Sequence, residues 1–83
     1  MDKGLLESPV VKRSIVIRGH KTSVTLEEPF WLGLWEIALE RGCPLGELVA
    51  QIDSERACSN LSSAIRMYVL AHFKAFHDQL AEY

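Results

Sequence analysis

Length, composition and charge exclude several classes of protein before any motif is considered. The 83 residues are 48% hydrophobic and include two cysteines, but no apolar run approaches the ~18 residues of a membrane span and no secretory signal is present, which predicts a small cytoplasmic domain without disulfides. The hydrophobic core of so small a domain gives little stability by itself, and we expect a second copy of the chain to complete it. The net charge of −2 combines +3 in residues 1–21 with −5 in residues 22–83, so any anion-binding face must lie near the N-terminal arm and the strand that follows it.

The N-terminal part of the chain predicts a flexible arm followed by one strand. Residues 1–12 mix glycine, proline and charges without a periodic pattern, which is typical of an arm. From Ser14 to Leu26 many residues are β-branched, which predicts extended chain. Hydrophobic residues take odd positions before Gly19 and even positions after it, which indicates a bend or bulge at this glycine. No second strand of like pattern follows, so we expect this strand to pair with its copy in a partner chain.

Three helices are predicted after the strand. The first begins near Glu27-Glu28-Pro29, where acidic residues and proline suit a helix N-terminus, and it ends at Arg41-Gly42. The second runs from Leu45 to about Glu55, and Asn60 is a candidate N-cap for the third. The predicted fold is therefore mainly α with one N-terminal strand, divided into an arm (1–12) and a domain (13–83) with an additional C-terminal helix. We expect the helices to form a shared dimer core of Phe30, Leu34, Trp35, Ile37, Leu45, Leu48, Val49 and Ile52.

The order of these elements resembles that of a known family of regulators. A strand reading Ser23-Val24-Thr25-Leu26, then a proline-initiated helix, a glycine turn and a second helix, resembles the ribbon-helix-helix proteins. The segments 18–26, 30–31 and 60–66 also look like those of a group of short bacterial proteins with this domain. The resemblance implies an intertwined homodimer whose intermolecular two-stranded antiparallel ribbon enters the major groove of double-stranded DNA. It therefore implies a sequence-specific DNA-binding protein that regulates transcription.

The resemblance also assigns roles to particular residues. The outward side chains of the strand, Lys21, Ser23 and Thr25, would contact bases, although short hydroxyls specify a base only weakly. Basic residues of the N-terminal segment would contact phosphates: Lys12, Arg13 and Arg18. The family also binds a phosphate at the N-terminus of its second helix, where the backbone N–H groups here belong to Leu45, Gly46 and Glu47. In an alternative register, the helix after Asn60 is that second helix, because its serines and Arg66 suit a phosphate better.

Each of these assignments has a simpler structural interpretation. Lys21, Ser23 and Thr25 also suit the solvent-exposed side of an edge strand. Trp31 and Trp35 lie four residues apart, which favours the dimer core over base stacking. No pair of histidines or cysteines has the spacing of metal ligands, so we expect neither a metal nor a cofactor.

Other functions compete with DNA binding to different degrees. The sequence contains no paired-carboxylate cleft, no nucleophile with a nearby base and no phosphate-binding glycine loop, so we do not expect an enzyme. The acidic residues after position 21 and the aromatic residues Phe73, Phe76 and Tyr83 fit an antitoxin-like or adaptor dimer that binds a protein partner through its third helix. A small-ligand or metal sensor on the same fold is a further alternative.

Overall fold

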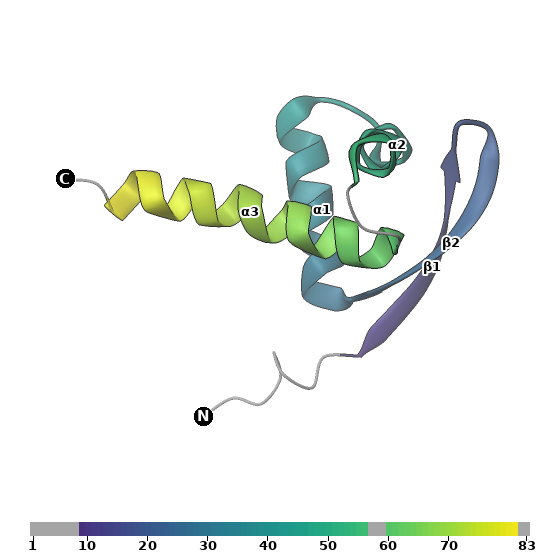
Figure 1. Ribbon diagram of the computed structural model, residues 1–83, viewed down its shortest axis with the longest axis horizontal. Coiled ribbons are helices and arrows are strands. Elements are labelled where there is room, and N and C mark those ends of the chain that lie inside the picture. Colours follow the sequence, from purple (N-terminus) through teal and green to yellow (C-terminus); the bar gives the residue numbers. More distant parts are fainter. Residues whose placement is uncertain (1–8, 57–59, 82–83) are drawn as a thin grey trace.

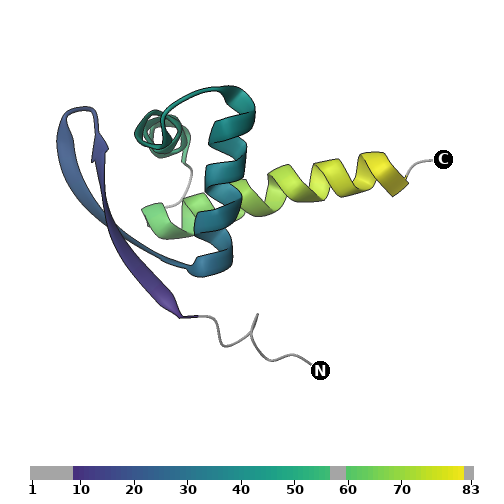
Figure 2. The same ribbon diagram turned by 180° about the vertical axis from the view of Figure 1, so that it is seen from behind.

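The protein consists of a β-hairpin followed by three helices. The structure is a computed structural model that describes residues 9–56 and 60–81, with side chains described as far as residue 77. The elements in chain order are β1 (Val10–Ile17), β2 (His20–Glu27), α1 (Glu28–Arg41), α2 (Leu45–Glu55) and α3 (Leu61–Ala81). The hairpin lies along one side of the helices, while α3 crosses α1 and extends past it on the other side (Figure 1). The view from behind shows the same arrangement (Figure 2).

The two strands pair antiparallel within one chain. Every residue of β1 has a partner in β2, from Val10 opposite Glu27 to Ile17 opposite His20. The turn consists of Arg18 and Gly19 alone, with φ angles of 52° and 82°. Two successive positive φ angles are typical of the type I′ turn, whose twist matches that of the strands it joins. The mainly helical fold with a two-stranded antiparallel ribbon is therefore confirmed.

The structure corrects the prediction of a single N-terminal strand that pairs with its copy in a partner chain. The partner of β2 is β1 of the same chain, and residues 10–12 of the predicted arm belong to β1. Residues 1–8 of that arm lie outside the described residues. The hydrophobic pattern changes parity at Gly19 because a two-residue turn places odd residues opposite even ones. Ile15 and Ile17 consequently face the core together with Val24 and Leu26.

The inward side of the hairpin and one side of each helix form a single core. Trp31 is completely buried, and its indole N–H donates a hydrogen bond of 2.9 Å to the carbonyl of Val11, which ties α1 to β1. Most of the predicted helical core is confirmed as buried, namely Leu34, Ile37, Leu48, Val49 and Ile52. Phe30 and Leu45 are half-buried at its edge. Trp35 instead lies on the surface, because the apolar stripe of α1 is wider than the area that the rest of the chain covers.

The helix ends follow the local signals of the sequence. The chain leaves α1 at Gly42, whose φ of 66° is left-handed and whose N–H donates to the carbonyl of Leu39 at 3.1 Å. At the start of α3, the side chain of Asn60 accepts a 3.1 Å hydrogen bond from the N–H of Ser63, as expected of an N-cap. The predicted bounds of the first two helices and the predicted N-cap of the third are confirmed.

Candidate nucleic-acid interface

One side of the hairpin faces solvent, and we call it the ribbon face. In an antiparallel pair, residues opposite each other project to the same side, and successive residues alternate between the two sides. The buried positions Ile15 and Val24 thus define the inner side. Four cross-strand pairs lie on this side of the hairpin. The ribbon face consists of three of them, Lys12 with Thr25, Ser14 with Ser23, and Val16 with Lys21, and the fourth, Val10 with Glu27, lies at its end. Thr25 is half-buried and the other five are exposed.

The ribbon face is electropositive although the whole chain is acidic. Its three pairs carry two lysines and three hydroxyl side chains and no carboxylate. The carboxylate of Glu27, at the end of the same side of the hairpin, binds the guanidinium of Arg66 with Nε–Oε1 and Nη2–Oε2 distances of 2.8 and 3.4 Å. This hydrogen bonding by Arg66 lowers the pKa of Glu27, so Glu27 stays ionised and its charge is offset by Arg66. The lysines therefore set the sign of the potential over the ribbon face.

The structure brings the three predicted base-contacting residues together on one face, which they share with Ser14. Lys21, Ser23 and Thr25 share the ribbon face, spaced two residues apart as predicted. Ser14 lies opposite Ser23 at the centre of the face, and sequence reasoning missed it. The signal that could have found it is the alternation of exposed and buried residues in β1, which becomes readable once residues 18 and 19 are recognised as a turn.

Of the predicted phosphate-contacting residues, Lys12 is on the ribbon face and Arg13 is not. Alternation along β1 turns Arg13 inward, where its guanidinium carbon lies 5.5 Å from the ring centre of Trp31 and 5.2 Å from that of Trp35. The guanidinium of Arg13 also forms a 3.6 Å ion pair with the carboxylate of Glu28. A planar cation held over two indoles stabilises the packing of the hairpin on α1. Arg13 thus ties the hairpin to α1.

Arg18 is also engaged within the chain. From the hairpin turn its guanidinium donates to the carbonyl of Ala50 at 3.1 Å and pairs with Asp53 at 3.3 Å. Arg56 binds the other carboxylate oxygen of Asp53 at 3.0 Å. These contacts fix the turn to the C-terminal part of α2. A phosphate at Arg18 would have to displace them.

The N-terminus of α2, predicted to bind a phosphate, lies against the hairpin. A Cβ atom added to Gly46 would collide with the carbonyl oxygen of Val16, so the backbone of β1 covers this turn of α2. The N–H of Glu47 donates to the carbonyl of Pro44 at 3.1 Å. Leu45 is half-buried and packs against the core. The strand therefore occupies part of the space that a phosphate would need.

The alternative register places the phosphate at the start of α3. There the Asn60 side chain already accepts the N–H of Ser63, and Arg66 already binds Glu27. One backbone N–H at this end of α3 and the Arg66 side chain, which favoured this register, thus already have partners inside the chain.

Within the described part of the chain, no group of three or more histidine, cysteine or acidic side chains is placed to hold a metal ion. Cys43 is a free, half-buried thiol, whereas Cys58 and Tyr83 lie outside the described residues. Among the helices that the structure describes, none combines the length and the apolar character needed to cross a membrane.

Comparison with known proteins identifies the family of this fold. Residues 10–73, more than half of the chain, match the family model described as the ribbon-helix-helix domain. The chain belongs to the ribbon-helix-helix domain family. Members are typically dimeric DNA-binding transcriptional regulators, and the fold is a non-enzymatic one. The matched range contains the whole ribbon face. No curated protein and no solved structure matches the chain.

Proposed function

We propose that this ribbon-helix-helix protein binds double-stranded DNA through the ribbon face and acts as a transcriptional regulator. The observation that carries the proposal is the composition of this exposed face, with two lysines and three hydroxyls but no carboxylate, on a ribbon of two strands. A two-stranded ribbon has the dimensions that the major groove of B-DNA admits. Membership in a family of DNA-binding regulators supports the same function.

The positions of the side chains suggest which of them contact bases and which contact phosphates. Ser14 and Ser23 are paired at the centre of the ribbon face, while Lys12 and Lys21 lie toward its opposite ends. In our proposal the hydroxyls of Ser14, Ser23 and Thr25 face base edges and Lys21 contacts a guanine or a phosphate. Lys12 contacts a phosphate. Because hydroxyls discriminate weakly among bases, DNA shape would contribute to sequence preference.

The electrostatic part of the affinity would come mainly from the two lysines. Arg13 and Arg18 have partners within the chain and are therefore not among the proposed phosphate contacts. A homodimer, the typical state in this family, would then neutralise about four phosphates and show a slope of log K against log salt near −3.6. As a regulator it would act where the DNA lies, in the cytoplasm of a bacterium according to the resemblance described above.

Fluorescence anisotropy tests this proposal directly. The protein is titrated into labelled random and genomic-fragment DNA at two salt concentrations, beside a Lys21→Gln variant. The matched control is Arg41→Gln, which removes the same charge from the end of α1 rather than from the ribbon face. We expect salt-dependent binding that Lys21→Gln weakens about tenfold and that Arg41→Gln leaves nearly unchanged. No binding even at low salt would reject DNA binding and favour the protein-partner alternative.

A further inference from the structure

A hollow lies between the tip of the hairpin, the C-terminal end of α2 and the first residue of α3. The tip of the hairpin and α2 lie side by side in Figure 1. The volume of the hollow is about 450 Å³, which is within the range of sites that hold small ligands. Ile17 and Leu61 contribute apolar surface to it. The polar side chains that line it are those of Arg18, His20, Thr22, Asp53 and Arg56.

Positive charges outnumber negative charges in this hollow, although the net charge of the whole chain is −2. Arg18 and Arg56 each carry a positive charge, and Asp53 is the one carboxylate among the described residues that line the hollow. The imidazole of His20 and the hydroxyl of Thr22 add groups that can donate hydrogen bonds. A site of this composition attracts an anion and offers donors to its oxygen atoms.

The carboxylate of Asp53 already lies between the two guanidiniums. Its Oδ2 is 3.3 Å from Nη1 of Arg18, and its Oδ1 is 3.0 Å from Nε of Arg56. Arginines bind an external carboxylate or phosphate through the same kind of contact. The side chains of Arg18, Arg56 and Asp53 are 54%, 30% and 25% exposed, and ion pairs that water reaches contribute little to stability. An anion of higher charge can therefore displace the Asp53 carboxylate at small cost.

We propose that this hollow binds a small phosphate monoester, whose phosphate group displaces the carboxylate of Asp53 and lies between Arg18 and Arg56. The two guanidiniums match the charge of a phosphate monoester dianion, whereas each phosphodiester of DNA carries a single negative charge. The hollow is larger than a phosphate group, so the organic part of the ligand fits beside it against Ile17 and Leu61. The proposal goes beyond DNA binding and does not depend on it, and it gives the small-ligand alternative a specific site.

An NMR titration of the nitrogen-15-labelled protein, without DNA and at constant ionic strength, tests the site. The probes are phenyl phosphate, inorganic phosphate and dimethyl phosphate, and the last of these carries one negative charge like the DNA backbone. We expect phenyl phosphate to shift the amide signals of the residues that line the hollow. It should bind about tenfold more tightly than dimethyl phosphate, with inorganic phosphate between the two. No shift of these signals with any probe, or equal affinity for phenyl and dimethyl phosphate, would overturn the proposal.

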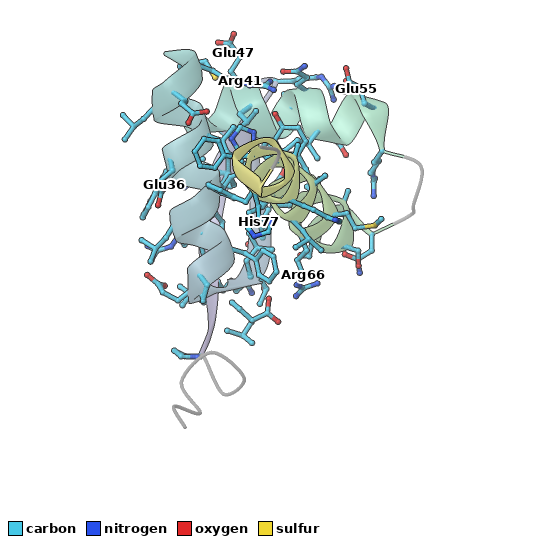
Figure 3. All side chains as sticks on the ribbon, turned by 90° about the vertical axis from the view of Figure 1, so that its left-hand side faces the viewer. Glu36, Arg41, Glu47, Glu55, Arg66 and His77 are labelled. Carbon is cyan, nitrogen blue, oxygen red and sulfur yellow. The ribbon has the colours of Figure 1, made fainter. Side chains whose placement is uncertain are left out.

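Single substitutions distinguish this site from general attraction of anions to the protein. Arg18→Gln and Arg56→Gln should each raise the Kd for phenyl phosphate about tenfold, whereas Asp53→Asn should lower it about threefold because the competing carboxylate is gone. The matched control is Arg41→Gln, since Arg41 lies at the opposite end of α2 from Glu55 (Figure 3). The same spectra show whether each variant is folded. An equal loss of affinity in Arg41→Gln, or weaker binding in Asp53→Asn, would contradict the proposal.

Discussion

The guanidinium of Arg66 in α3 holds the carboxylate of Glu27, the last residue of β2, at 2.8 Å. This ion pair joins the end of the ribbon to the third helix across 39 positions of sequence. It has two effects, since it fixes the position of the hairpin on the helices and offsets the charge of the carboxylate that follows the ribbon face. Both effects depend on the ionised form of Glu27.

Replacing Glu27 by glutamine should make the stability of the protein less dependent on pH. The pKa of Glu27 is lowered from its ordinary value of 4.5, mainly by the hydrogen bond from Arg66. The stabilisation is therefore fully present above pH 4.5 and is lost as the pH falls through the lower pKa of the folded state. Thermal unfolding at neutral and at acidic pH should show a small loss of Tm at neutral pH in Glu27→Gln and little difference at acidic pH. An equal loss at both pH values would contradict an ionic role.

Replacing Arg13 should lower the stability of the fold but have little effect on the affinity for DNA. Arg13→Ala removes the cation from above two indoles and should lower the free energy of unfolding by about 1 kcal/mol. Arg13→Lys keeps the charge but not the planar group, so it should recover only part of this loss. Urea denaturation measures the stability of both variants. If Arg13 contacted phosphate, its removal would instead weaken DNA binding as much as Lys12→Ala does.

Placing alanine at Gly46 should destabilise the protein although it favours a helix. Alanine normally stabilises a helix relative to glycine by roughly 0.5–1 kcal/mol. At Gly46, however, the new methyl group would collide with the backbone oxygen of Val16, so the hairpin and α2 must separate. We expect a loss of about 2 kcal/mol in the free energy of unfolding, measured by chemical denaturation. A more stable Gly46→Ala variant would show that β1 does not lie against this turn.

The number of phosphate contacts can be counted from the dependence of DNA binding on salt. If Lys12 and Lys21 each contact one phosphate per chain, either alanine variant should make the slope of log K against log salt shallower by about 1.8 for a dimer. Ser23→Ala should leave the slope unchanged while altering the preference among DNA sequences. Equal slopes in the wild type and in both lysine variants would rule out these contacts.

The sequence by itself determined the elements whose signals are local. A proline in the first turn, a glycine after the last turn and an asparagine cap act within a few residues, so the ends of the helices could be placed from the sequence. The alternation of Lys21, Ser23 and Thr25 likewise placed three side chains on one face of a strand. The order of strand and helices was sufficient to indicate the family.

Only the tertiary structure decided which strand pairs with β2 and which charged groups are engaged. The partner strand depends on the turn that Gly19 completes, whereas the sequence pattern around Gly19 also suits a bend within one strand. The turn decides on which side of the ribbon Lys12 and Arg13 lie. The neighbours of Arg13 and Arg18, on α1 and α2, are set by packing between distant segments. Likewise, Trp31 is buried and Trp35 exposed because the hairpin and the other helices cover only one side of α1. Such contacts arise from the assembly of the whole chain, and periodicity within one segment carries no information about them.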